Sequence, residues 1–211
     1  MTTEDLIRAL VADRFAGQGP RAALLWALVS AIAIVATLFF SWIGFRDDIE
    51  AALLTVRFLF KFLIIVPLAM LSFATLLRST APVSEPNWWE TLLSLPLMLL
   101  VVGVAAELLA IPRSDWLVRL IGSNAVNCMM LIPTLACAPL ALFIMTLKSG
   151  APANSGPAGA VAGLAAGSLA AVFYATNCFD DSPLFVVTWY PLAIGSVVLA
   201  GYFAGKRFLR W

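Results

Sequence analysis

The sequence contains no histidine, and only 12% of its residues are charged. Without histidine the chain lacks the most common metal ligand and the usual general base at neutral pH, which argues against most hydrolases and metalloenzymes. Its 13 basic residues are nearly balanced by 12 acidic residues, so we expect no basic surface that could follow a phosphate backbone. The composition therefore predicts that the protein is not an enzyme and does not bind nucleic acid directly.

Hydrophobic residues, by contrast, make up 62% of the chain, against roughly 45–50% in soluble domains. An apolar segment of about 20 residues can cross a hydrocarbon core about 30 Å thick, and the sequence has six such segments. They cover residues 22–45, 58–77, 88–111, 124–147, 156–176 and 183–203. We therefore predict an all-α polytopic membrane protein, in which residues 22–211 form one bundle of six transmembrane helices embedded in the lipid bilayer.

The distribution of basic residues indicates the orientation of this bundle. Eight of them lie in the two tails and in the connectors that share a side with the tails, and five lie at the other side. Because cytoplasmic loops carry an excess of lysine and arginine, this bias places both termini in the cytoplasm. We expect a multi-pass protein of the bacterial cytoplasmic (inner) membrane, with Asp180 and Asp181 in an outer loop.

Residues 1–21 form a separate cytoplasmic segment. Thr2 and Asp5 have the spacing of a capping box at the start of a helix. An apolar stripe at helical spacing follows, made of Leu6, Ile7, Leu10, Val11 and Phe15. A helix of about 12 residues is marginal alone in water, so we interpret this segment as one that becomes ordered against a groove on a partner protein. Docking on the membrane surface is an alternative interpretation of the same pattern.

Two of the three cysteines are expected at the outer side of the membrane. Cys128 lies near the outer end of the fourth span, and Cys178 lies in the loop after the fifth. These thiols could form a disulfide, or they could hold a soft divalent cation with Asp180 and Asp181 as auxiliary ligands. Two unpaired buried cysteines are a third interpretation. Cys137 falls near the middle of the membrane, where we interpret it as a packing residue.

Two ionisable residues fall inside predicted spans. Lys61 lies about one turn from the outer end of the second span, and Glu107 about one turn from the outer end of the third. Ionisable groups in lipid are costly unless they are paired, so we predict an ion pair between these two residues. Snorkelling of each side chain to the interface is the alternative.

Small residues recur every four positions in the last two spans. Gly159, Gly163 and Gly167 form a double GxxxG pattern, and Gly201 and Gly205 form another. Such patterns let helix backbones approach closely. We expect them to pack the two spans within one chain, with homo-oligomerisation as the alternative.

The two ends of the chain carry the features of a known family. Residues 177–185, with the sequence NCFDDSPLF, are followed by Trp189 and Tyr190 and by a final GKRFLRW at 205–211. These features, with the opening DLI and LVAD of residues 5–13, resemble the NrsF family of negative regulators of sigma-F-type extracytoplasmic-function (ECF) sigma factors.

The resemblance implies a membrane-bound anti-sigma factor whose N-terminal segment holds an ECF sigma factor away from RNA polymerase. It further implies that two outward cysteines, matched here by Cys128 and Cys178, respond to heavy-metal or oxidative stress. The resemblance implies no cofactor apart from a heavy-metal ion that binds transiently. Asn177 stands where many members have histidine, a difference that favours thiol oxidation over chelation.

Two other functions are consistent with a small polytopic protein. A transporter or channel would need polar residues converging near the membrane midplane, for which Thr134 and Ser168 are the candidates. A membrane thiol oxidoreductase normally uses a closely spaced cysteine pair, and the sequence has no C-x-x-C.

Overall fold

The computed structural model describes residues 19–79, 91–150, 152 and 154–209. All regular elements in these residues are helices, which confirms the all-α prediction. They are α2 (Pro20–Trp42), α3 (Ile49–Leu53), α4 (Val56–Arg78), α6 (Ser94–Ala110), α7 (Arg113–Ile121), α8 (Ala125–Gly150), α9 (Ser155–Ala175) and α10 (Pro183–Phe208). The predicted binding stripe of Leu6, Ile7, Leu10, Val11 and Phe15 lies outside the described residues.

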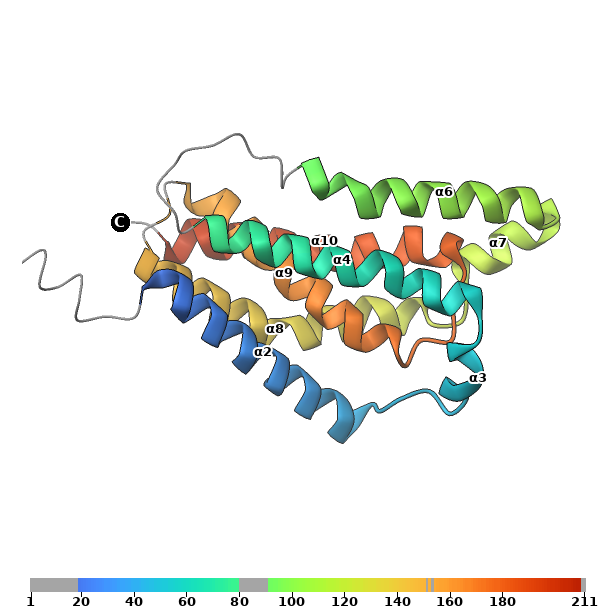
Figure 1. The fold of residues 1–211 in the computed structure, drawn as a ribbon, viewed down its shortest axis with the longest axis horizontal. Coiled ribbons are helices and arrows are strands. Elements are labelled where there is room, and N and C mark those ends of the chain that lie inside the picture. The colour runs from blue at the N-terminus through green and yellow to red at the C-terminus, as the bar shows by residue number, and fades with distance from the viewer. Residues whose placement is uncertain (1–18, 80–90, 151, 153, 210–211) are drawn as a thin grey trace, which may run out of the picture.

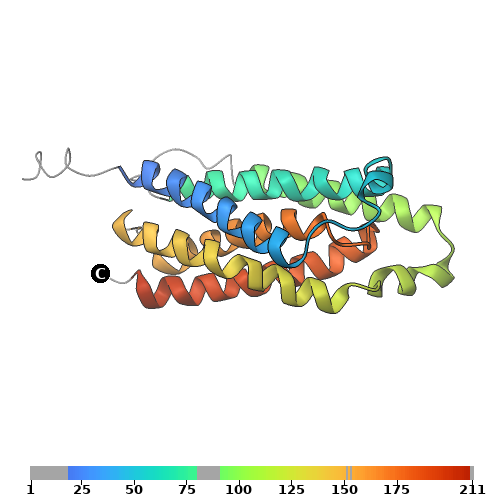
Figure 2. The ribbon, with the colours of Figure 1, turned by 90° about the horizontal axis from the view of Figure 1, so that it is seen from below.

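The long helices run side by side along the longest axis of the molecule (Figures 1 and 2). Five helical stretches in the described residues are long and apolar enough to cross a membrane, and α6, with 17 residues, is a shorter apolar helix. Each of the six predicted spans thus coincides with a helix. The start of α2 and the end of α10 lie at one end of the bundle, and the short helices α3 and α7 lie at the other (Figure 1).

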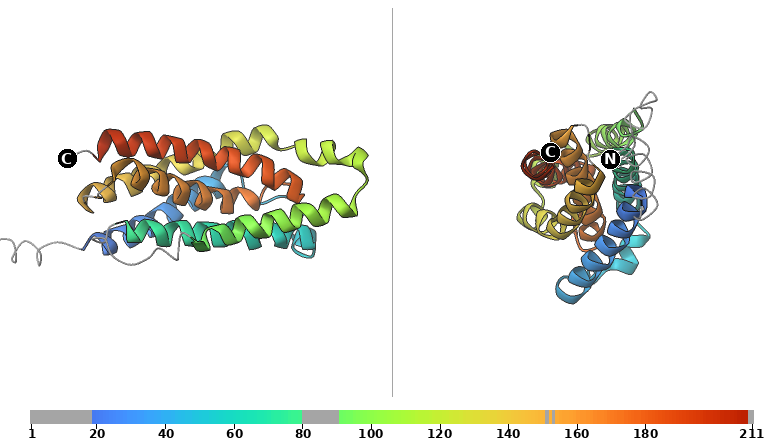
Figure 3. Two further views of the ribbon diagram at one scale, coloured as in Figure 1. Left: turned by 90° about the horizontal axis from the view of Figure 1, so that it is seen from above. Right: turned by 90° about the vertical axis from the view of Figure 1, so that its left-hand side faces the viewer.

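Helix α9 lies in the middle of the bundle. Two-thirds of its apolar window (67%) is buried, whereas the corresponding share in the other candidate spans is 28–44%. It packs against α4, α8 and α10, which surround it (Figure 3). The reason is its composition, because alanine and glycine side chains are small enough for neighbouring helices to approach from several directions.

Helices α9 and α10 approach each other closely at their glycines. A Cβ atom built on Gly159 would lie 2.2 Å from the carbonyl oxygen of Gly201, and one on Gly205 would lie 2.3 Å from that of Ser155. Even an alanine is therefore too large at these positions. The prediction that the glycine patterns pack the last two spans within one chain is confirmed.

The polar residues considered for transport do not converge. Ser168 is buried and hydrogen-bonds to Ser72 across the α4–α9 interface, with 3.0 Å between the two hydroxyl oxygens. Thr134 is exposed on α8, where its hydroxyl donates to the Met130 carbonyl of its own helix. Cys137 is also exposed on α8, so its interpretation as a buried packing residue is wrong. Its thiol donates to the Pro133 carbonyl one turn earlier, and its side chain faces outward from the bundle.

Candidate functional site

The loop between α9 and α10, residues 177–182, is held by contacts with distant parts of the chain. Its end is fixed by the start of α10, where the Ser182 hydroxyl caps the helix by accepting from the Leu184 N–H and Pro183 occupies the first position. At its beginning, the side-chain amide of Asn177 donates to the Gly44 carbonyl at 3.2 Å. The loop is therefore connected at one side to the segment that follows α2.

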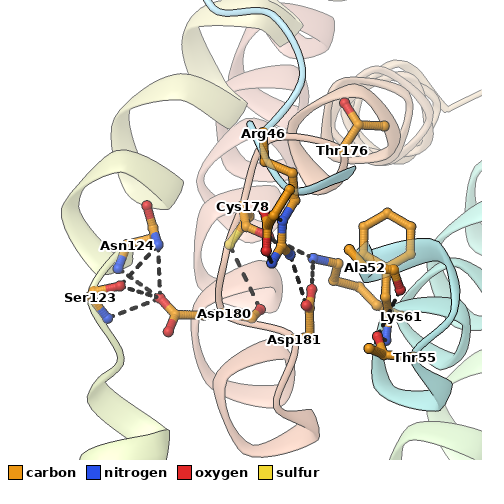
Figure 4. Close-up of polar contacts among 12 residues, drawn as sticks. Arg46, Ala52, Thr55, Lys61, Ser123, Asn124, Thr176, Cys178, Asp180 and Asp181 are labelled. Atoms are coloured by element: carbon orange, nitrogen blue, oxygen red, sulfur yellow. Dashed lines mark hydrogen bonds and ion pairs between the residues drawn. The ribbon is translucent and has the colours of Figure 1, made fainter. Parts of the chain in front are cut away.

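Cys178 is completely buried in this loop. Its thiol donates to the Asp180 carbonyl at 3.7 Å (Figure 4). Its own carbonyl accepts from Lys61 Nζ at 3.1 Å and from Arg46 Nη1 at 3.2 Å. Burial raises the pKa of the Cys178 thiol, and the positive charge of Lys61 is the largest of the influences that act in the opposite direction.

Asp181 pairs with the same two cations. Its carboxylate accepts from Lys61 Nζ at 2.5 Å and from Arg46 Nη1 at 2.8 Å (Figure 4). The Arg46 guanidinium also makes two bonds to Asp48, of 2.6 and 2.8 Å. These bonds to Asp48 raise the pKa of Arg46 and lower the pKa of the Asp48 carboxyl. The predicted ion pair of Lys61 with Glu107 is wrong, because Asp181 of the loop is the carboxylate that Lys61 contacts.

Glu107 has its own set of partners. It is buried near the end of α6 and forms ion pairs with Arg119 at 3.2 Å and Arg57 at 3.5 Å. Its second oxygen accepts from the Ser182 hydroxyl at 2.6 Å and from the Leu184 N–H at 3.2 Å. Glu107 therefore ties α6 and α7 to the start of α10, where a negative charge is also favourable to the helix dipole.

Asp180 connects the loop to the start of α8. Its Oδ2 atom accepts from the backbone N–H groups of Ser123 at 2.9 Å and Asn124 at 2.7 Å, and from the Asn124 side-chain amide at 3.1 Å (Figure 4). Backbone N–H groups at a helix start have no partner within the helix, so the carboxylate supplies one. Gly122, with φ of +59°, permits the sharp turn from α7 that brings these groups to Asp180.

Cys128 lies one turn into α8, and its N–H donates to the Asn124 carbonyl at 2.8 Å. The same carbonyl accepts from the Tyr174 hydroxyl at 3.2 Å. Cys128 and Cys178 are both fully buried in one core cluster with Tyr174 and Tyr190. The Cys178 loop reaches the same turn through Asp180, which accepts from the Asn124 N–H at 2.7 Å. The prediction that these two cysteines share one end of the bundle is confirmed.

Both cysteines are free thiols in this structure. In the part of the chain that the structure describes, no group of three or more His, Cys, Asp or Glu side chains is arranged to hold a metal ion. The carboxylates of Asp180 and Asp181, considered as auxiliary ligands, are occupied by hydrogen-bond donors. Disulfide formation and metal ligation by Cys128 and Cys178 stay predictions.

A polar cleft of about 890 Å³ opens beside the loop. Arg57 and Arg119 line it from α4 and α7, and the four loop residues after Cys178 line it from the other side. Cys178 itself does not line the cleft. A reactive molecule that enters the cleft therefore meets the loop before it meets the thiol.

Several residues of this end are not singled out by the sequence. In the sequence, Arg46 is only one of the basic residues whose distribution predicts the orientation of the bundle. Tyr174 and Tyr190 show no pattern that distinguishes them from other aromatic residues in predicted spans. The hydroxyl of Tyr190 is buried next to the thiols and has no hydrogen-bond partner among the described residues. The density of charged residues in the connector between predicted spans one and two is the available signal for Arg46.

Comparison with known proteins identifies the family. The profile of the NrsF family, described as negative regulator of sigma F, matches residues 10–211. The chain is 31% identical over 213 residues to a protein of Azospira oryzae named probable anti-sigma-F factor NrsF, with both chains covered completely. It is 28% identical over 214 residues to the anti-sigma-F factor NrsF of Caulobacter vibrioides, again with complete coverage of both. No solved structure matches the chain. With a match that extends over almost every residue, the chain belongs to the NrsF family of negative regulators of sigma F.

Proposed function

We propose that this chain is an anti-sigma factor of the bacterial inner membrane that holds an ECF sigma factor at the cytoplasmic face. The observation that carries the proposal is the full-length match to the family and to relatives named anti-sigma-F factors. The long apolar helices supply the membrane anchor. Residues 1–21, with the stripe that includes Leu6, Leu10 and Phe15, are the sigma-binding segment, because no connector between spans is long enough to form a comparable surface.

The sensor in this proposal is the pair Cys128 and Cys178. Hydrogen peroxide from outside transfers one oxygen atom to one thiol, which becomes a sulfenic acid, and the other oxygen leaves as water. The second thiol then attacks that sulfur, a second water is released, and the disulfide contains the two oxidised sulfurs. Two electrons pass from the thiols to the peroxide. The position of both buried thiols at one end of the bundle supports this pairing, because Asp180 of the Cys178 loop accepts from the Asn124 N–H, and the Asn124 carbonyl accepts from the Cys128 N–H.

The contacts of the 177–182 loop support a route from the thiols to the rest of the bundle. The loop contacts α4 through Lys61, α6 through Glu107 and the start of α8 through Asn124. A covalent change at Cys178 therefore strains contacts with three spans at once. Coupling of this kind typically amounts to about 1–3 kcal/mol, which would weaken sigma binding roughly 5- to 150-fold.

The test is transcription from a sigma-dependent promoter in cells that carry Cys128→Ser, Cys178→Ser or Cys137→Ser. We expect loss of induction by peroxide in the first two variants and normal induction in the third, because Cys137 lies exposed on α8 away from the loop. Induction that persists undiminished in both Cys128→Ser and Cys178→Ser would overturn the thiol sensor. Induction by a heavy-metal salt but not by peroxide would replace oxidation with ligation as the trigger.

A further inference from the structure

An apolar pocket of about 270 Å³ lies between α4, α6, α9 and α10. Every residue that lines it is aliphatic, glycine or proline, with the exception of Tyr190. Leu97 of α6 and Pro191 of α10 are exposed and form its mouth. Ile65 of α4 and Tyr190, each 2% exposed, form its floor. The pocket therefore leads from the outer surface of the bundle into its interior.

The pocket lies halfway along the bundle. Leu68, Leu164 and Gly195 line it, and each lies next to the midpoint of its helix. The middle of a hydrocarbon core about 30 Å thick is about 15 Å from either headgroup layer. Ordered water does not suit the pocket, because water needs polar partners that this lining does not offer. In a membrane, the molecules that reach this depth are hydrocarbon chains.

Helix α6, which forms one wall of the pocket, packs loosely on the bundle at whose edge it lies (Figure 1). Only Pro96, Leu100 and Glu107 of its 17 residues are buried. In its second half α6 approaches α4 closely, since a Cβ atom built on Gly103 would lie 2.3 Å from the Phe60 ring. In its first half, residues 93–100 border the pocket instead. The packing of α6 is therefore incomplete where the pocket lies.

We propose that an acyl chain of a membrane phospholipid occupies this pocket and completes the packing of α6 on the bundle. Packed interiors leave few voids larger than a water molecule. An apolar cavity of about 150 Å³ holds benzene, so a pocket of about 270 Å³ has room for several methylene groups. Its mouth is continuous with the apolar surface that faces lipid, to which Leu97 and Leu192 belong, each 54% exposed. The inference goes beyond the proposed function and rests only on the membrane anchor in it.

Gly195 offers a way to fill the pocket without displacing the protein around it. It lines the pocket, and a Cβ atom built on it would meet no other atom within 4 Å. Gly195→Leu should therefore place its side chain in the space of the acyl chain. Leu192→Phe is the matched control, because Leu192 belongs to the same helix but does not line the pocket.

The experiment uses the full chain in vesicles of phosphatidylethanolamine and phosphatidylglycerol, with a phosphatidylcholine probe that carries a diazirine in the middle of one acyl chain. Irradiation releases dinitrogen from the diazirine, and the remaining carbene inserts into a neighbouring C–H bond. Mass spectrometry of peptides locates the labelled residues. Ile132, a fully buried isoleucine outside the pocket, gives the background, and Leu63, 56% exposed, gives the labelling of a lipid-facing side chain.

We expect the label on Ile65 to lie well above that on Ile132 in the parent chain and in Leu192→Phe. In Gly195→Leu it should fall to the level of Ile132, whereas the label on Leu63 should stay the same. Unchanged labelling of Ile65 in Gly195→Leu would overturn the inference.

The parent chain alone also tests the inference, which matters if Gly195→Leu does not accumulate in the membrane. A label on Ile65 no higher than that on Ile132, with Leu63 labelled, overturns the inference and leaves the membrane anchor standing. A second copy of the chain seated in the pocket would give this result, because it would keep the probe out. Absence of label from Leu63 as well would refute the membrane anchor, and the inference with it.

Discussion

The ammonium of Lys61 and the carboxylate of Asp181 form a buried ion pair between residues 120 positions apart in the sequence. The pair joins the second turn of α4 to the loop that carries Cys178. Because the carboxylate also contacts Arg46, one side chain of the loop neutralises two cations from different segments. This arrangement makes Asp181 the residue on which the packing of this end of the bundle depends most directly.

Replacement of Asp181 by alanine should therefore destabilise the protein. Lys61 would stay buried without its carboxylate, and breaking a buried ion pair from one side costs about 3 kcal/mol or more. The free energy of unfolding of the full chain in detergent micelles, measured by titration with denaturant, checks this. Asp48→Ala is the control, since Asp48 is 49% exposed and Arg46 keeps its contact with Asp181 in that variant. Equal losses of free energy of unfolding in Asp181→Ala and Asp48→Ala would contradict the stabilising role assigned to Asp181.

The α9–α10 interface should tolerate no added methyl group at Gly159. A Cβ at this position would meet the Gly201 carbonyl oxygen at 2.2 Å, so the two backbones must separate. We expect Gly159→Ala to lower the free energy of unfolding by about 1–3 kcal/mol, the range for overpacked interiors. Gly195→Ala in α10 is the matched control, because a methyl group added there would meet no other atom within 4 Å. Equal free energies of unfolding for Gly159→Ala and Gly195→Ala would show that the interface accommodates the added methyl group without loss of stability.

The apolar stripe of the N-terminal segment should be needed for sigma binding. Leu6→Asp and Leu10→Asp place a charge on the face proposed to enter an apolar groove, so we expect loss of co-purification with the sigma factor and transcription without stress. Arg8→Ala, which leaves the stripe unchanged, should behave like the parent protein. Membrane levels of each variant are measured alongside, so that poor accumulation is not mistaken for lost binding. Normal co-purification of the two aspartate variants would place the binding surface elsewhere.

The buried thiol of Cys178 should make stability depend on alkaline pH. Burial raises its pKa above the ordinary value of 9.0, so the folded state favours the neutral thiol at a pH where the unfolded chain ionises. The stabilisation is therefore fully present below about pH 9 and is lost progressively as the pH rises above it. We expect the free energy of unfolding to fall more steeply between about pH 9 and 10 in the parent than in Cys178→Ser, by up to about 1.4 kcal/mol per pH unit. An equally steep fall in Cys178→Ser would contradict this expectation.

Hydropathy is sufficient to predict the positions of the six helices, because the length of an apolar run is a local property of the sequence. It is also sufficient to place Cys128 and Cys178 at one end, since the number of crossings between them fixes their side. The partners of Lys61 and Glu107 are not predictable in the same way. Their equal depth follows from the sequence, but the choice of partner depends on the path of the 177–182 loop and on α7, a short helix with a polar face that hydropathy does not detect.

The backbone contact between Gly159 and Gly201 leaves no side chains at that point to change rotamer, so α9 and α10 can shift only as one rigid body. The loop that carries Cys178 connects these two helices. With 26 residues at 1.5 Å each, α10 extends about 39 Å from that loop. A small tilt produced at the thiol end would therefore reappear, enlarged by this length, at the opposite end of the bundle, where α2 begins.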